Sequence, residues 1–335
     1  MPPMIRMRHL FLAVVTKYSE TNAVSLLISE RRGRHYVAWT SKSKWLIVEV
    51  VRMFETLRQH PLLVLNQAAR DPLDTLAALQ DSFHSRIEPI NTIGYTADPD
   101  WESALHRHLG MSFESEGEGF WPLWSTVVET LRAQGMAVGP CSFYEWNDGD
   151  AGLVRAIWCL IRRLRPVNVV ETGVAHGMTS RFILEALETI GAGRLWSIDL
   201  PPLNPMTRQE VGVAVRQTGV PVERWTYIAG TSRRRLPALL SRLGRIDLFI
   251  HDSMHSNRNV MFELECAWRY LSAGGVIVVD DIDVNTAFDT FTRAHPEHPS
   301  FVCTAEPLRP DTRRFNQKGL FGIICKQSPQ GADPE

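Results

Sequence analysis

The sequence predicts an α/β protein whose C-terminal part is built on a mainly parallel sheet, preceded by a smaller, mainly helical N-terminal auxiliary domain. From about residue 168 onward, short apolar runs without strict alternation are separated by amphipathic segments. This pattern is typical of parallel strands covered by helices on both faces. The last two apolar runs are separated only by a polar loop, which predicts an antiparallel hairpin that closes the sheet.

Each element of this fold has its own segment of sequence. The expected parallel strands are Val167–Gly173, Leu195–Leu200, Trp225–Gly230, Ile246–Asp252 and Val276–Asp281. The expected helices lie near 178–190, 207–218, 233–243 and 257–272. The hairpin consists of Phe301–Ala305 and Leu320–Cys325.

The first 150 residues give weaker signals. Val24–Ser29 and His35–Thr40 flank the turn-like Glu30–Arg34 and predict a small hairpin, while Trp45–His60 has helical spacing and Asp71–Asp74 can start another helix. The acidic, glycine-containing loop 114–119 suggests a boundary. We therefore expect an auxiliary domain at 1–115, a lead-in at 116–150, the principal domain at 151–328 and a flexible tail at 329–335.

Composition and charge narrow the classes of protein. The 335 residues contain 36 Lys and Arg against 37 Asp and Glu, a balance that argues against a dedicated nucleic-acid binder. The charge is unevenly spread: residues 1–62 carry 10 basic and 4 acidic groups (+6), 63–150 carry 4 and 14 (−10), and 151–335 carry 22 and 19 (+3). No apolar run is long enough for a membrane span, and the N-terminus lacks the pattern of a signal peptide, so we expect a cytoplasmic protein. The five cysteines form no C-x-x-C pair, which favours free thiols over disulfides or a zinc site.

The most informative motif is V-V-E-T-G-V-A-H-G-M-T-S at 169–180. Gly173 and Gly177 allow a tight strand-to-helix turn that a ligand can approach, and the helix N-terminus offers free N–H groups to a carboxylate. The spacing is neither the G-x-G-x-x-G of a dinucleotide fold nor a P-loop. Asp199 ends the second strand, where an acid can accept both ribose hydroxyls of a nucleoside.

Over 150–327 the chain resembles the class I S-adenosylmethionine (SAM)-dependent methyltransferases. The resemblance rests on the glycine turn, on Asp199, and on the segments I-A-G-T-S (228–232), I-H-D-S-M-H-S (250–256) and G-G-V-I-V-V-D-D (274–281). It implies a Rossmann-like seven-stranded sheet with a reversed terminal strand. Many relatives carry an acid, which receives the adenine amino group, where this chain has Thr231. The implied cofactor contacts are Glu171, Thr172, Gly173, Ala175, His176, Gly177, Thr179, Asp199, Thr231, Ser232 and Asp252.

A second cluster follows the fourth and fifth strands. Asp252 closes one and Asp280 and Asp281 close the other, so three carboxylates meet at one edge of the sheet, where a hard divalent cation such as Mg²⁺ would relieve their repulsion. His255 lies beside them and is suited to removing a hydroxyl proton. This D-x-x-H and D-D arrangement resembles the macrocin-type, metal-dependent sugar O-methyltransferases. That resemblance implies Asp252, Asp280 and Asp281 as Mg²⁺ ligands and His255 as general base, with Asp252 at the catalytic centre. The relatives often have Glu at the position of Asp280.

These observations predict a SAM-dependent O-methyltransferase that acts on a hydroxyl group of a small molecule, a sugar or natural product, with Mg²⁺. We expect a homo-oligomer with neither nucleic-acid nor membrane partners. His176 and His251 lie near the same edge, although a lone histidine is more often structural.

Three alternatives remain open at this point. The first is a metal-free methyltransferase of a peptide or carrier-bound substrate, which the N-terminal domain would recognise. The second is a nucleic-acid methyltransferase, which the H-D-S-M-H sequence disfavours because amino-methylating enzymes have N-P-P-Y or D-P-P-Y there. We interpret the basic run Arg233–Arg235 as a solvated face of a helix and not as a contact to phosphates. The third is a methyltransferase fold that has lost catalysis, against which the glycine turn, Asp199 and His255 argue.

Overall fold

The computed structural model describes residues 29–30, 33–34, 61–88, 94–111, 118–133, 151–200, 211–216, 219–304 and 319–327. Contacts divide the chain into two units, Met1–Pro61 and Leu62–Glu335. The boundary expected from the sequence lies near residue 115, so the helices between 62 and 115 fall in the larger unit. No helix among the described residues is long and apolar enough to cross a membrane.

The first unit contains one described pair of strands, β1 (Ser29–Glu30) and β2 (Gly33–Arg34). They pair antiparallel, with Ser29 opposite Arg34 and Glu30 opposite Gly33. A hairpin is therefore present where it was predicted, but its paired residues lie almost entirely inside the segment expected to be the turn. The helix expected at 45–60 lies outside the described residues.

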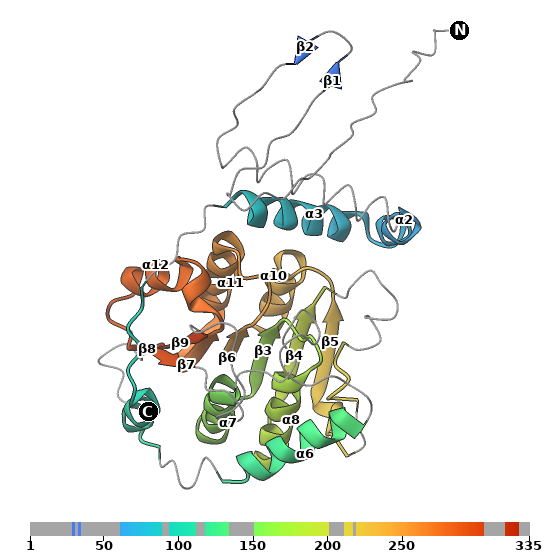
Figure 1. The fold of residues 1–335 in the computed structure, drawn as a ribbon. Coiled ribbons are helices and arrows are strands. Elements are labelled where there is room, and N and C mark those ends of the chain that lie inside the picture. The colour runs from blue at the N-terminus through green and yellow to red at the C-terminus, as the bar shows by residue number, and fades with distance from the viewer. Residues whose placement is uncertain are drawn as a thin grey trace. The chain divides into compact units, whose positions relative to one another are not determined.

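The second unit is built on a seven-stranded sheet in the order β5-β4-β3-β6-β7-β9-β8 (Figure 1). Strands β3 to β7 are parallel to one another, and β9 runs antiparallel to both β7 and β8. The predicted hairpin and the reversed strand are confirmed. The strands are β3 (Asn168–Thr172), β4 (Arg194–Asp199), β5 (Trp225–Ala229), β6 (Ile246–His251), β7 (Leu271–Val279), β8 (Ser300–Thr304) and β9 (Leu320–Cys325).

Helices cover both faces of this sheet, as the apolar strands require. In Figure 1, α7 and α8 lie below the sheet with α6 beside them, whereas α10 and α11 lie above it and α3 crosses over them. Of the helix expected near 207–218, residues 211–216 are described and form turns. The helices are α2 (Pro61–Arg70), α3 (Pro72–Ile87), α4 (Trp101–Leu109), α6 (Phe120–Ala133), α7 (Ala151–Leu164), α8 (Met178–Ile190), α10 (Ser232–Leu243), α11 (Asn257–Tyr270) and α12 (Ala287–Ala294), with the short turns η1 (Val222–Arg224) and η2 (Ile282–Val284).

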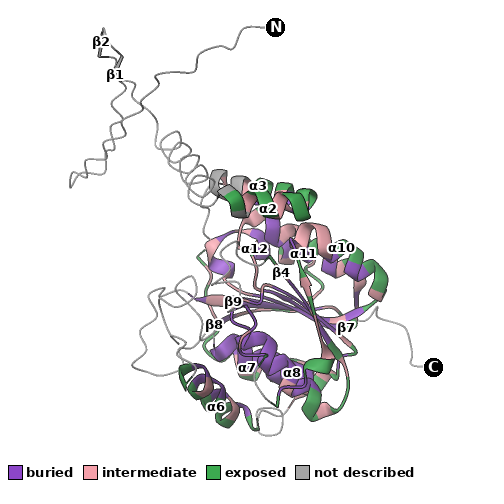
Figure 2. Ribbon diagram, turned by 90° about the vertical axis from the view of Figure 1, so that its right-hand side faces the viewer, coloured by how far each residue is buried: buried purple, intermediate pink, exposed green. Residues whose placement is uncertain are grey.

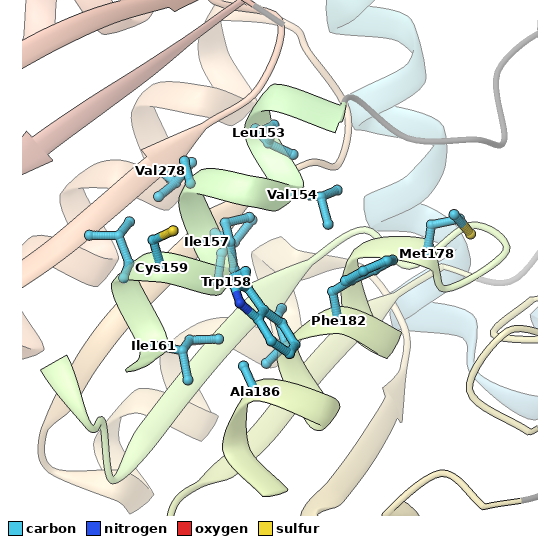
Figure 3. Close-up of a cluster of buried hydrophobic side chains, with 14 of the residues drawn as sticks. Leu153, Val154, Ile157, Trp158, Cys159, Ile161, Met178, Phe182, Ala186 and Val278 are labelled. Atoms are coloured by element: carbon cyan, nitrogen blue, oxygen red, sulfur yellow. The ribbon is translucent and has the colours of Figure 1, made fainter. Parts of the chain in front are cut away.

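The hydrophobic core has one part on each face of the sheet. On the α7–α8 face, Ile157 and Phe182 are fully buried and pack with apolar side chains of the strands (Figure 3). The buried residues of Figure 2 follow the strands and these two helices through the centre of the unit. From α6, Phe120 and Trp124 place their rings 5.2 and 5.4 Å from that of Phe182, so α6 belongs to the same core.

The basic run Arg233–Arg235 differs from its prediction. It is not a solvated face, because all three guanidinium groups pair with carboxylates of α3 or its N-cap, Asp71. Arg233 lies 2.7 Å from Asp81, and its guanidinium also stacks over the ring of Phe262. The sequence could not show this pairing because the partners are more than 150 residues apart.

Candidate functional site

The predicted site residues meet at the carboxyl ends of the parallel strands. We call this edge the rim, and it consists of the last residues of β3, β4, β5, β6 and β7 and the residues that follow them. Backbone hydrogen bonds connect neighbouring segments of it. Gly173 N–H donates to Ile198 O, and Gly230 N–H donates to Asp199 O, each at 2.9 Å. Asp252 N–H donates to Thr172 O at the same distance. The rim is therefore continuous from the first glycine turn to the acidic cluster.

The glycine turn needs its glycines for the packing of the backbone. Gly173 has φ of +85°, and a Cβ there would collide with the carbonyl oxygen of Asp252. Gly177, the N-cap of α8, has φ of +82°, and its Cβ would lie 2.9 Å from the Cα of Gly212. Ala175, between them, adopts a left-handed φ of +46°, which is strained for a residue with a side chain. Such strain persists where the surroundings enforce it, and it is common at binding sites.

Glu171 is the last residue but one of β3 and is completely buried. The hydroxyls of Ser180 and Ser197 donate to its Oε2 at 2.6 and 2.7 Å. Burial raises the pKa of Glu171 to about 7, although these two hydrogen bonds lower it. Its Oε1 is buried without a hydrogen-bond partner among the described residues. A cationic or N–H group of a ligand would satisfy this oxygen.

Asp199 lies beside the glycine turn at the end of β4. The backbone N–H groups of Val174 and Ala175 both donate to its Oδ2 at 3.3 Å. These bonds hold the carboxylate against the turn. Burial raises the pKa of Asp199, and the backbone hydrogen bonds oppose this effect. An acidic side chain therefore lies beside the glycine turn, at the position that the sequence predicted.

The acidic cluster follows β6 and β7. Asp252, His255 and Asp280 each place a potential metal-ligand atom within 4.8 Å of the others. Burial, together with the charges of Asp281 and Glu171, raises the pKa of Asp252 to about 8, and the pKa of Asp280 is also raised, chiefly by burial. The two carboxyls share a hydrogen bond. A divalent cation bound there would reduce the repulsion between these carboxyls.

The donor set fits a divalent cation. Oδ1 of Asp280 is buried and has no hydrogen-bond partner in the described part of the chain. Two carboxylates and an imidazole are suitable ligands for a divalent cation, and the shorter side chain at position 280 reaches the group. Asp281, a predicted third ligand, lies outside this group of three. It has a left-handed φ of +48° and directs its Oδ2 to 3.8 Å from Nε2 of His255.

His255 combines partial exposure with a neutral ring. Its side chain keeps 27% of its surface exposed. Burial lowers the pKa of His255 to about 4, and the nearby charge of Asp281 opposes this shift. A neutral imidazole has a free lone pair, so it can accept a proton or bind a metal. Its Nε2 faces Asp281, whose charge would stabilise the protonated ring.

A buried polar network behind the rim was not predicted. Glu263 of α11 is fully buried and accepts hydrogen bonds from Thr172 Oγ1 at 2.5 Å and Ser253 Oγ at 2.8 Å. Nδ1 of His251 lies 2.6 Å from the same carboxylate, and the His251 ring meets that of His255 edge-on at 5.4 Å. The only sequence signal is that Glu263 interrupts the buried apolar stripe of α11.

Several predicted cofactor contacts have their side chains directed elsewhere. The hydroxyl of Thr172 is committed to Glu263, and that of Thr231 donates to Asp74 at 2.8 Å. Ser232 Oγ–H donates to Asn259 at 3.4 Å. His176 and Thr179 are buried within and just after the glycine turn. Thr231 is committed through its backbone as well, because its N–H also donates to Asp74, at 3.0 Å.

Comparisons with known proteins agree with this geometry. Residues 170–282 match a family model described as a methyltransferase domain. The matched segment contains the glycine turn, Asp199, His255 and the acidic cluster. This match covers about a third of the chain, and the observed strand order agrees with the seven-stranded methyltransferase sheet that the sequence predicted. No curated protein sequence matches the chain.

Among solved structures, the chain is similar to the O-methyltransferase TomG from Streptomyces achromogenes, involved in tomaymycin synthesis and solved with SAM. The identity is 16% over 61% of this chain and 89% of that one, with a TM-score of 0.43. An O-methyltransferase from Bacillus cereus, in complex with S-adenosylhomocysteine, is 12% identical over 61% and 90% of the two chains, also at 0.43. The S-adenosylhomocysteine-bound methyltransferase PaMTH1 from Podospora anserina is 13% identical over 71% and 100%, at 0.42. At these similarities, the site must be argued from this chain's own residues.

Proposed function

We propose that this protein is a SAM-dependent O-methyltransferase that methylates a hydroxyl group of a small molecule such as a sugar or natural product. The observation that carries the proposal is the position of His255 and its acidic neighbours on the same rim as the glycine turn and Asp199. A cofactor at the turn and an acceptor at the cluster would then be adjacent. Proximity and alignment of two reactants can remove several kcal/mol from a barrier.

The residues at the cofactor end have separate roles. Asp199 would accept the ribose hydroxyls, and the free Oε1 of Glu171 would accept from the ammonium group of the methionine moiety. The backbone of the glycine turn would hold the carboxylate at the start of α8. When bound, SAM supplies a sulfonium methyl group that passes to the acceptor oxygen and leaves S-adenosylhomocysteine.

The residues at the acceptor end handle the proton. His255 Nε2 would take the hydroxyl proton as the oxygen–methyl bond forms and the sulfur–methyl bond breaks, and Asp281 would stabilise the resulting imidazolium. Asp252 and Asp280 would hold Mg²⁺, with Asp281 as the further ligand that the sequence predicts. A cation bound there would lower the pKa of the acceptor hydroxyl.

The substitution His255→Ala, combined with chelation, tests this assignment. Because a base acts only in the chemical step, we expect the variant to lose at least 100-fold in methyl transfer from labelled SAM to a panel of hydroxylated acceptors. Its affinity for S-adenosylhomocysteine should change less than threefold. EDTA should inhibit the wild-type protein, and Mg²⁺ should restore it.

Three results would refute parts of the proposal. Turnover close to wild type in His255→Ala removes the base. A variant that has lost Mg²⁺ affinity instead makes His255 a metal ligand, which its place in the group of three permits. Activity unchanged in chelator would favour the metal-free alternative with a peptide or carrier-bound acceptor, for which the β1–β2 pair of the first unit is the candidate recognition element.

A further inference from the structure

Helix α3 connects the starts of two helices that border the rim. Its two capping carboxylates, Asp74 near its start and Glu88 at its C-cap, are 14 residues apart, which corresponds to about 21 Å along a helix. Figure 1 shows α3 running across α10 and α11. The first of these helices follows the cofactor side of the rim, and the second follows His255.

Asp74 caps α10. Its side chain is 2% exposed, and its Oδ1 accepts from the N–H of Thr231 at 3.0 Å and from the hydroxyl of Thr231 at 2.8 Å. Thr231 is the N-cap residue of α10, but its side chain makes no capping bond within that helix. A Cβ at Gly230 would collide with the carboxylate of Asp74, so the glycine is needed for this approach. An acid supplied by α3 thus replaces the missing local cap.

Glu88 adds a second cap to α11, whose local N-cap Ser256 already accepts from the N–H of Asn259. One carboxylate oxygen accepts from the N–H of Asn257 at 2.7 Å and the other from the N–H of Arg258 at 3.0 Å. These are the first two residues of the helix, and the segment before them contains His255. The position of Glu88 therefore determines where the loop that carries the candidate base enters α11.

Ion pairs at Asp71, which precedes the first contact, and at Asp81, which lies between the two, hold α3 in place. Asp71 lies 2.6 Å from both Arg234 and Arg235, and Asp81 lies 2.7 Å from Arg233. The last pair involves a carboxylate that is 8% exposed and that accepts from the guanidinium of Arg233, not from the N–H groups of a helix start. It is thus a matched reference, because it contributes to docking but caps nothing.

We propose that α3 is a brace with two separable effects on the methyltransferase site, an inference that rests on the proposed function. Asp74 positions the turn of residues 230–232 and thereby sets affinity for the cofactor. Glu88 positions residues 253–256 and thereby the loop of the candidate base. Both are positioning residues that act through backbone N–H groups.

The test compares single substitutions in the full chain by calorimetry with S-adenosylhomocysteine. Asp74→Ala should raise the Kd at least tenfold, because the N-cap turn loses both bonds. Asp74→Asn should stay within threefold, because an amide oxygen can accept the same two bonds. Glu88→Ala and the reference Asp81→Ala should both stay within threefold.

Amide hydrogen exchange of the ligand-free proteins separates the two arms of the brace. Asp74→Ala should accelerate exchange at 230–234 at least tenfold and leave 253–259 unchanged, whereas Glu88→Ala should do the reverse. Asp81→Ala should accelerate neither segment. If Asp74→Ala does not fold, Asp74→Glu keeps the charge but moves the carboxylate against Gly230, and it should also weaken binding tenfold.

The brace is refuted if Asp74→Ala binds S-adenosylhomocysteine as well as wild type, or if Asp81→Ala weakens binding equally. It is also refuted if either capping variant accelerates exchange in both segments alike. A wild-type protein that binds no S-adenosylhomocysteine would contradict the proposed function, whereas the exchange experiment would still report on the brace.

Discussion

At the scale of single residues, burial determines the chemistry of the rim carboxylates. Glu171 is completely buried, and this burial raises its pKa to about 7. Asp199, one strand away, keeps part of its surface exposed and is held by backbone N–H groups. The two acids lie near the ends of neighbouring strands but differ in their burial and in their hydrogen-bond donors.

The raised pKa of Glu171 makes the ligand-free protein less stable at high pH. A folded-state pKa of about 7 against about 4.5 in the unfolded chain gives a contribution that is complete below pH 4.5 and lost as the pH rises through 7. The loss is on the order of 3 kcal/mol. Glu171→Gln should remove it, so that chemical denaturation at pH 5 and pH 8 gives a smaller decrease in unfolding free energy than in wild type. An equal decrease in both proteins would show that Glu171 is ionised in the folded state, and the exposed Glu223→Gln serves as control.

The sequence identified the residues whose role follows from their place on a strand. Gly173, Asp199 and Asp252 were found because they follow apolar runs that end at one edge of a parallel sheet. Glu263 and Asp74 were missed because their roles depend on contacts across 91 and 157 residues. The metal set was predicted from the ends of two neighbouring strands and from the family resemblance, and the structure groups His255 with Asp252 and Asp280 instead of Asp281.

At the scale of elements, α11 supports the rim from behind. Its buried carboxylate, Glu263, connects the end of β3, the end of β6 and the loop at Ser253. Burial raises the pKa of Glu263, but the interactions with His251 and the hydrogen bonds of neighbouring hydroxyls outweigh it and lower the pKa to about 2. Helix α11 is therefore attached to the site by a charged group, in addition to its apolar face.

Replacement of this carboxylate should destabilise the fold. In Glu263→Gln an amide N–H₂ faces donors, so we expect a loss of roughly 3 kcal/mol in unfolding free energy at pH 7. The stability from the lowered pKa is complete above about pH 4.5 and disappears as the pH falls through 2, so the difference between the proteins should shrink at acid pH. Urea titrations at pH 7 and pH 3 measure this. A loss no larger than that of the exposed neighbour Glu265→Gln would contradict the role of the network.

The elements themselves were largely predictable. Each predicted strand of the second unit overlaps an observed one, because buried parallel strands read as apolar runs. The largest difference is in β7, which begins at Leu271 instead of 276, since the glycines at 274 and 275 resembled a turn. The attachment of α3 to α10 was not predictable. The sequence of a basic run does not show whether its side chains are solvated or paired with aspartates far away in the chain.

At the scale of the whole molecule, the uneven charge along the chain acquires a partial explanation. The acidic zone of residues 63–150 includes Asp71, Asp74, Asp81 and Glu88, which pair with arginines of α10 or cap α10 and α11. Part of the negative charge of this zone therefore holds α3 against the helices that border the site. The contacts that define the second unit begin at Leu62, so this support is continuous with it.

Removal of the first unit tests whether residues 1–61 serve recognition. A chain beginning at Leu62 keeps α3 and its own hydrophobic core, so it should fold and bind S-adenosylhomocysteine within threefold of the full chain. A chain beginning at residue 111 loses the brace and should bind at least tenfold more weakly. Equal affinity in both truncated chains would contradict a role for α3. If the chain beginning at Leu62 no longer methylates a peptide but still methylates a free small acceptor, the recognition alternative is favoured.

The central claim is that the rim binds SAM, and isothermal titration calorimetry of the full chain tests it most directly. The account predicts a Kd in the micromolar range for SAM (about −8 kcal/mol at 1 μM) and an affinity at least tenfold lower for Asp199→Ala. A wild-type titration without binding heat at several temperatures, or an Asp199→Ala variant that binds as tightly as wild type, would contradict it.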